Sequence, residues 1–338
     1  MSLIGIIASS RLSGPTEFIA VSTINSPRVS IYPWSSATGF GTKYADPSTA
    51  VAGQGRAAAF TPDKSAVAVA SASSPFIQVY AWSGAGFGAK YSDPATLPAG
   101  ACRRVEFSNN GDAIAVAHTT TPFVSAYPWS AGFGTKYANP ATLPTGNGQG
   151  IDFIANDSAI AVSHLTSPRV SVYPWSAGFG TKYANPATLP TGEGNSVVFN
   201  PAGNAIAVAH DVSPRVSAYP WSSGFGTKYS NPATLPAGDS YGIDFTPASN
   251  AIAVSHANSP HVSAYPWSSG FGTKYANPAS AVISLGYDVA FSANGDAIAV
   301  AYDTPDYINA YAWSSGFGTK YSSPATLPAD FAIGVTFI

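Results

Sequence analysis

Seven tryptophans divide the 338-residue chain into repeats. Consecutive tryptophans lie 46 to 48 residues apart, a tyrosine precedes each by two residues, and a Gly-Phe-Gly-(Thr/Ala)-Lys-Tyr block follows each. Residues 127–146 and 173–192 are identical at all 20 positions. The fold must therefore be built from seven similar units. The tryptophans are Trp34, Trp82, Trp129, Trp175, Trp221, Trp267 and Trp313.

Each repeat contains four short segments that alternate between large and small side chains or are rich in β-branched and aromatic residues. In the sixth repeat they cover 242–245, 251–256, 261–267 and 271–276, and Gly, Pro, Asn and Ser clusters separate them. This pattern predicts four antiparallel strands, named a, b, c and d in chain order. Strand b has large side chains on one face and alanine or serine on the other, which favours stacking of one sheet on the next.

The low charge of the chain excludes some functions. Only 9% of the residues are charged, the net charge is −2, and 45% are hydrophobic. A basic patch for nucleic acid is not expected, and disorder is not expected either. No apolar run approaches the roughly 18 residues of a membrane span, and residues 1–11 lack the features of a secretory signal. The single cysteine, Cys102, cannot form an internal disulfide.

A period of roughly 40 to 50 residues with four strands per repeat is typical of a β-propeller. Residues 105–117, Val-Glu-Phe-Ser-Asn-Asn-Gly-Asp-Ala-Ile-Ala-Val-Ala, resemble a strand, turn and strand of WD40 and YVTN-type repeats. The resemblance covers nearly the whole chain. However, Pro-Trp-Ser or Ala-Trp-Ser replaces the Trp-Asp pair of WD40, and the Gly-His pair before strand a is missing. The hydrogen-bond network of the WD40 family is therefore not expected.

The Tyr-Pro-Trp and Gly-Phe-Gly-Thr-Lys-Tyr blocks also resemble repeats of phage-encoded virion-associated propellers. That resemblance implies a structural or host-attachment role and a place on a virion. The expected fold is all-β: a seven-bladed β-propeller with four antiparallel strands per blade, forming one domain over residues 1–338.

The ends of the chain predict how the ring closes. Residues 331–338 match strand a of a repeat without b, c or d, whereas the first repeat begins with strand b. We expect the C-terminal segment to be the innermost strand of the first blade. Residues 4–9 could compete for that place, but Phe337 follows Trp313 by the same 24 residues that separate Phe153 from Trp129.

Three recurring polar positions have structural interpretations. The histidines at the end of strand b are too far from the axis to meet at a metal, so hydrogen bonds between blades are expected. The lysine before the last tyrosine of each repeat is expected to protect the outer strand from edge pairing; a ring of contacts for an acidic partner is the alternative. One position in strand a holds a carboxylate in only three repeats, which is weak evidence for catalysis. These positions hold His118, His164, His210 and His256; Lys43, Lys90, Lys136, Lys182, Lys228, Lys274 and Lys320; and Glu106, Asp152 and Asp244.

Two positions vary while their surroundings repeat. The first, four residues before the strand-a phenylalanine, is called the pre-phenylalanine position. The second, after the proline of the b–c turn, is called the post-proline position. The first holds Arg56, Arg103, Gln149, Asn195, Tyr241, Tyr287 and Ile333, and the second holds Arg28, Phe76, Phe123, Arg169, Arg215, His261 and Asp306.

In an up-and-down blade, the d–a and b–c connections emerge on the same face. Both variable positions should therefore lie on one rim, the first of them beside the central channel. Tyr, Arg, Gln and Asn are residues of recognition surfaces, and free drift of loop positions is the alternative explanation.

The predicted function is binding of a protein or glycan on this rim, without catalysis. The expected contact residues are Arg56, Arg103, Gln149, Asn195, Tyr241, Tyr287, Arg28, Arg169, Arg215 and His261. The alternative is a propeller lectin with several equivalent sugar sites between blades, where tryptophan or tyrosine would stack on sugars. An enzyme is the least supported class, because neither a Ser-His-Asp arrangement nor a phosphate loop is present. No metal or cofactor is expected.

Overall fold

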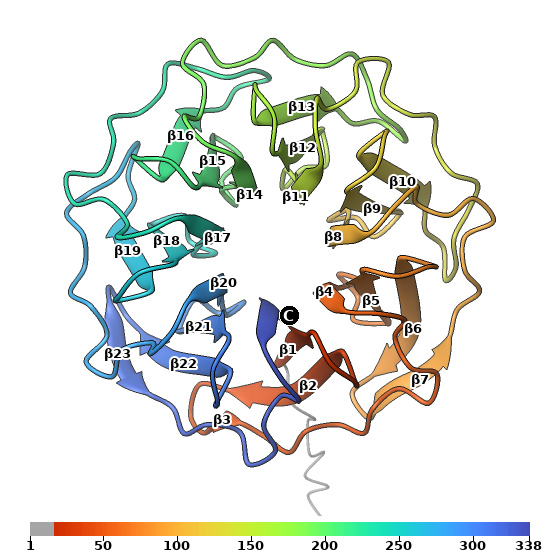
Figure 1. Ribbon diagram of the computed structural model, residues 1–338, viewed down its shortest axis with the longest axis horizontal. Coiled ribbons are helices and arrows are strands. Elements are labelled where there is room, and N and C mark those ends of the chain that lie inside the picture. The colour runs from red at the N-terminus through yellow and green to blue at the C-terminus, as the bar shows by residue number, and fades with distance from the viewer. Residues whose placement is uncertain (1–16) are drawn as a thin grey trace, which may run out of the picture.

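The computed structural model describes residues 17–338. Its 24 strands form seven antiparallel sheets that stand as blades around a central axis (Figure 1). Blade 1 consists of β24, β1, β2 and β3, and blades 2 to 7 follow in chain order from β4 to β23. Within residues 17–338, no helix is long and apolar enough to cross a membrane. The predicted seven-bladed β-propeller is confirmed.

The strands fall into four classes by distance from the axis. Strands a, nearest the axis, are β24 (Ala332–Phe337), β4 (Gly55–Phe60), β8 (Cys102–Phe107), β11 (Gly148–Phe153), β14 (Gly194–Phe199), β17 (Ser240–Phe245) and β20 (Gly286–Phe291). Strands b are β1 (Glu17–Thr23), β5 (Ala66–Ser71), β9 (Ala113–His118), β12 (Ala159–His164), β15 (Ala205–His210), β18 (Ala251–His256) and β21 (Ala297–Tyr302). Strands c are β2 (Val29–Ser35), β6 (Ile77–Ser83), β10 (Val124–Pro128), β13 (Val170–Pro174), β16 (Val216–Pro220), β19 (Val262–Pro266) and β22 (Ile308–Trp313). Strands d are β3 (Gly39–Phe40), β7 (Gly86–Lys90) and β23 (Phe317–Lys320).

The ring closes through the C-terminal strand, as predicted. β24 pairs with β1, with Phe337 opposite Ile19. The backbone amides of Phe18 and Ile338 donate to each other's carbonyls at 2.9 and 3.0 Å. Residues 4–9, the alternative, lie outside the described residues. Hydrogen bonds between the two ends of the described chain therefore complete the first blade.

The outermost strand is weaker than predicted. In blades 3 to 6 it is reduced to an isolated bridge between the tryptophan and the following phenylalanine, so these blades have three strands. The reason is a proline before the tryptophan, such as Pro128, which has no N–H to donate to a fourth strand. Blade 1 has Pro33 at this position and an outer strand of only two residues, whereas blades 2 and 7 have Ala81 and Ala312 and keep longer outer strands.

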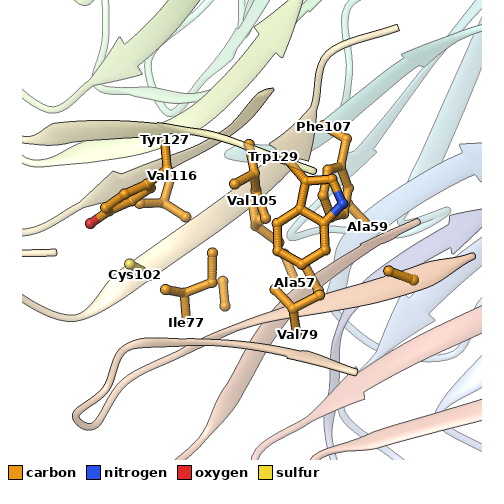
Figure 2. Packing of buried hydrophobic residues seen from close by; sticks show 14 residues of the cluster. Ala57, Ala59, Ile77, Val79, Cys102, Val105, Phe107, Val116, Tyr127 and Trp129 are labelled. Carbon is orange, nitrogen blue, oxygen red and sulfur yellow. The ribbon is translucent and has the colours of Figure 1, made fainter. Parts of the chain in front are cut away.

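The blades pack on one another through the two faces of strand b. In β9, Ile114 and Val116 join a cluster with blade 2, whereas the alanines on the other face pack against blade 4. Figure 2 shows the first of these clusters, in which Val116 and Trp129 lie with Ala57 of β4. Each buried Ile or Val contributes about 1.5–3 kcal/mol. The predicted stacking of large side chains on the neighbouring blade's alanines is confirmed.

Each tryptophan lies at the junction of two blades. The Trp129 ring meets Tyr91 of blade 2 and Phe107 of its own blade edge to face, with ring centroids 5.1 and 5.4 Å apart. Trp34 makes the equivalent contacts across the ring closure, with Tyr321 at 5.0 Å and Phe337 at 5.2 Å. Such pairs are worth about 0.5–1.5 kcal/mol beyond their buried area. The repeated tryptophan thus holds successive blades together.

Candidate functional site: the mouth of the central channel

Every strand a contains a β-bulge at the pre-phenylalanine position. Opposite β9, Cys102 pairs with His118 and Arg104 with Ala117, so Arg103 between them has no partner in the ladder. A register shift at this position recurs in all seven blades. A bulge redirects a side chain, and bulges are frequent beside functional sites. The sequence placed this position in the connection before strand a, whereas the structure places it within the strand.

The seven bulge residues line a single cavity. Its volume is about 320 Å³, and Arg104 and Leu165 complete its wall. The residues change in kind around the ring: two arginines are followed by two amides, two tyrosines and an isoleucine. In blade order from blade 2 they are Arg56, Arg103, Gln149, Asn195, Tyr241, Tyr287 and Ile333. The predicted grouping of these positions beside the channel is therefore observed.

The cationic side of this cavity carries charge without a carboxylate partner. Among the described residues, neither Arg56 nor Arg103 forms a salt bridge, and the Nε atom of each is buried without a hydrogen-bond acceptor. Arg56 donates only to Gln54 through Nη2. Burial lowers the pKa of both guanidiniums, and the charge of Arg103 lowers the pKa of Arg56 further.

The opposite side is aromatic and polar. The Tyr241 and Tyr287 rings lie with centroids 5.9 Å apart and planes tilted by 39°. Burial raises the pKa of both phenols, so they are neutral hydrogen-bonding groups at neutral pH. Asn195 donates through Nδ2 to the Ser240 carbonyl at 2.9 Å, which fixes the orientation of its amide.

The post-proline residues lie on the same rim but outside this cavity. An added Cβ on Gly55, at the start of β4, would lie 2.1 Å from the Arg28 carbonyl oxygen of the preceding blade, and Gly194 meets Arg169 in the same way. Arg215 donates to the Asp211 carbonyl at 2.7 Å, and the His261 carbonyl packs on Gly286. These residues join the b–c turns to the next blade's strand a.

One assignment at the post-proline position is wrong. In blade 7 the backbone amide of Tyr302 donates to the Tyr307 carbonyl, the bond that His256 makes to His261 in blade 6. Tyr307 also has the positive φ, 69°, of this position. Tyr307 therefore replaces Asp306, because the proline of this copy stands one residue earlier than in the others.

An ion pair across the channel forms the floor of the cavity. Arg104 of blade 3 donates through Nη1 and Nη2 to the two carboxylate oxygens of Asp288 in blade 7, at 2.6 and 2.9 Å. Only 3% of the Asp288 side chain is exposed. Sequence comparison missed this pair, although the repeats carry a signal: this position is small in the five other blades. Its residues are Ala57, Arg104, Gly150, Ser196, Gly242, Asp288 and Gly334.

Below this floor lies a second cavity of about 220 Å³, lined by the strand-a carboxylates. Asp152 accepts a hydrogen bond from the Phe199 amide at 2.6 Å, and Asp244 accepts one from the Phe291 amide at 2.8 Å, each from the next blade. Burial raises the pKa of Glu106 and of Asp244 to about 7, and that of Asp152 well above its usual value. Within residues 17–338, no three His, Cys, Asp or Glu side chains are placed to hold a metal ion.

The four histidines of strand b bond within their own blade, not between blades as predicted. Each Nε2 lies 2.9–3.1 Å from the hydroxyl of a serine on strand c, as His256 does with Ser263. In blade 7, Tyr302 and Asn309 form the equivalent pair at 3.0 Å. The side chains are fully buried, and burial is the main cause that lowers the pKa of each histidine to about 4.

These histidines should make stability fall in acid. Their stabilising effect is complete above the unfolded pKa of about 6.5 and is lost as the pH falls towards 4, by about 2 kcal/mol per imidazole at pH 5. The carboxylates with raised pKa act in the opposite sense, because their protonation below pH 7 relieves a buried charge. His256→Gln should therefore shrink the difference in unfolding free energy between pH 7.5 and pH 5 by about 2 kcal/mol. Urea unfolding at both pH values measures this, and an unchanged difference would refute it.

The recurring lysines bond close by in sequence. Six of them donate to the Asp or Asn side chain three residues later, as Lys43 does to Asp46. In blade 7, Ser323 occupies that place, and Lys320 lies 3.8 Å from Asp306 instead. The proposed protection of outer edges stays a prediction.

Comparison with known proteins places the fold. No family model matches the chain, and no curated protein matches it. Among solved structures, a presumed 6-phosphogluconolactonase of Bacteroides uniformis has a TM-score of 0.70 at 15% identity, covering 95% of this chain and 99% of its own. A second, from Bacteroides fragilis, has a TM-score of 0.73 at 13% identity, covering 95% and 98%. The periplasmic gluconolactonase PpgL of Pseudomonas aeruginosa has a TM-score of 0.70 at 15% identity, covering 95% and 99%.

At these low sequence identities, the similarity shows the fold alone. They agree with the resemblance to YVTN-type repeats and lend no support to the phage resemblance. The chain is a seven-bladed β-propeller with the fold of these lactonase-like structures.

Proposed function

We propose that the rim cavity binds one anionic small molecule per chain, without catalysis. The observation that carries this proposal is the pair Arg56 and Arg103, two guanidiniums that share a cavity and have no carboxylate partner among the described residues. Holding two like charges together in a partly buried cavity is unfavourable, and a bound anion would offset that cost. A phosphate or carboxylate group is the natural partner of the guanidinium fork.

The rest of the ligand would face the amides and tyrosines. Gln149 and Asn195 offer donors and acceptors, and the tyrosines offer two apolar faces and two hydroxyls. An anion attached to a hydroxyl-bearing or flat body would use both sides of the cavity. Because the seven bulge residues change in kind around the ring and line one cavity, the site does not repeat, so one ligand is expected.

A lectin in which tryptophans stack on sugars, the alternative from the sequence, has little support. The seven tryptophans are only 2–7% exposed, and other aromatic rings cover their faces. The phage attachment role would be a special case of rim binding, in which the partner is a protein or glycan of the host surface. The post-proline residues Arg28, Arg169, Arg215 and His261 would then extend the contact beyond the cavity.

Lactone hydrolysis is a second candidate, because three structures of this fold carry lactonase names. An acidic sugar lactone would suit the charge of the rim cavity. Against catalysis, the carboxylates with raised pKa lie beyond the Arg104–Asp288 floor, and two of them are engaged by backbone amides. We expect that the protein does not accelerate the hydrolysis of 6-phosphogluconolactone above its spontaneous rate. An acceleration that Arg103→Ala abolishes would favour lactonase activity instead.

Titration calorimetry tests the binding proposal. We expect inorganic phosphate or an acidic sugar such as 6-phosphogluconate to bind at one site per chain, and glucose not to bind there. Arg103→Ala should weaken binding by about 10- to 100-fold, the value of a charged hydrogen bond of about 1.5–3 kcal/mol. Arg169→Ala, which changes an arginine of the same rim outside the cavity, is the matched control. Equal effects of the two variants would contradict the proposal.

A further inference from the structure

The face opposite the rim cavity carries equivalent clefts between blades. One cleft, of about 420 Å³, lies between the a–b turns of blades 2 and 3 beside Trp129. Another, of about 220 Å³, lies between the a–b turns of blades 6 and 7 beside Trp313. Equivalent turn residues and the same repeated tryptophan line both clefts, so the two clefts are equivalent positions of the repeat.

The tryptophan indoles present unused hydrogen-bond donors near these clefts. Within residues 17–338, no tryptophan Nε1 has an acceptor from the protein. In Trp34 and Trp82 this nitrogen is fully buried, whereas Trp129 and Trp313 line the clefts. The faces of Trp129 and Trp313 pack against neighbouring rings, and their Nε1 atoms, unlike those of Trp34 and Trp82, are not fully buried. A donor left unpaired on binding is costly, so an acceptor on a ligand would stabilise the complex.

The other lining groups are hydroxyls, amides and carboxylates. Neither cleft is lined by lysine or arginine, and hydrogen bonds from Thr61 and Ser65 lower the pKa of Asp63, which keeps it an acceptor. In the first cleft the carboxylates of Asp63 and Asp112 would repel an anionic ligand, whereas a neutral polyol could donate to them; the second cleft has no charged lining group. The polar lining residues are Thr61, Asp63, Ser65, Asn110, Asp112 and Ser130 in the first cleft, and Thr246, Asn250, Asn294, Ser314 and Ser315 in the second.

We infer that these inter-blade clefts bind neutral saccharides, with a sugar oxygen accepting from the indole N–H of Trp129 or Trp313. The first cleft, of about 420 Å³, lies within the range of ligand pockets, roughly 300–1,000 Å³, and the second, of about 220 Å³, lies below it, so each suits one or two sugar rings at most. The two clefts lie on one face, so a branched or surface-bound glycan would engage both at once. This binding is separate from that of the rim cavity in both location and ligand charge.

Indole N–H signals provide a direct test in the full chain. A glycan array first identifies a neutral saccharide, which is then titrated into ¹⁵N-labelled protein. The indole signals of Trp129 and Trp313 should shift, and those of Trp34 and Trp82 should not. Shifts confined to backbone amides of the rim, or silence of every neutral saccharide on the array, would overturn the inference.

Paired variants give a second test. Trp129→Phe and Trp313→Phe together keep an aromatic ring but remove both donors, so the affinity for the saccharide should fall about tenfold or more, the value of one or two hydrogen bonds. Trp82→Phe removes a donor that is fully buried and should leave the affinity unchanged. Melting temperatures show whether each variant folds. Equal affinities in the double variant and in Trp82→Phe would overturn the inference, and Arg103→Ala should not affect this binding.

Discussion

Deleting residues 331–338 should abolish cooperative folding of the propeller. β24 supplies the innermost strand of blade 1, and its Ala332 and Val335 are buried against β1 and the neighbouring blades. Phe337 covers one side of Trp34. Without this strand, β1 has an unpaired edge and blade 7 loses its neighbour near the axis. The expected loss exceeds about 5 kcal/mol, which is comparable with the whole stability of an ordinary domain.

A synthetic peptide of residues 329–338 should restore folding when added to the truncated chain. Circular dichroism and thermal melting as functions of peptide concentration measure this rescue, because a ligand that binds only the folded ring stabilises it by mass action. The same peptide with Val335→Asp places a charge in the buried position and should fail. A truncated chain that melts at the temperature of the intact protein would show that the ring closes in another way.

The sequence was sufficient for the fold because each repeat serves as a control for the others. The spacing of Phe337 after Trp313 predicted the closing strand, and the alternation in strand b predicted how blades stack. Comparison of copies also found the seven residues that line the rim cavity, since these positions vary while their neighbours do not. That comparison works wherever equivalent residues have equivalent surroundings.

The features that the sequence did not predict correctly have physical reasons. The bulge that points Arg103 into the cavity is a property of strand pairing, which depends on contacts between strands and not on the residue itself. The length of the outer strand in blades 3 to 6 was overestimated, because the effect of Pro128 and its equivalents on the neighbouring strand was not considered. Asp306 was assigned to the post-proline position because the repeats were aligned on the proline of the b–c turn. In blade 7 that proline stands one residue earlier, although the backbone of the turn is the same.

The Arg104–Asp288 pair lay beyond sequence reasoning for a different reason. The two residues are unique among their equivalents, and they meet only because the ring brings blade 3 opposite blade 7. Small residues at the other five equivalent positions leave room for the long arginine side chain. An added Cβ on Gly242 would lie 2.6 Å from the Asp288 carboxylate, so the glycine is required for this close approach.

Asp288→Ala should therefore destabilise the protein by about 3–5 kcal/mol, because it leaves a largely buried guanidinium without its counter-charge. The loss includes the hydrogen bond that Asp288 accepts from the Val335 amide at 3.1 Å, so the floor of the cavity and the closing strand should weaken together. Arg104→Ala added to Asp288→Ala should recover part of the loss, because no uncompensated charge then remains. Urea unfolding of the two single variants and the double variant gives the coupling energy, with Ser196→Ala, at the equivalent position in blade 5, as the control. Additive losses would mean that the pair makes no specific contribution to stability.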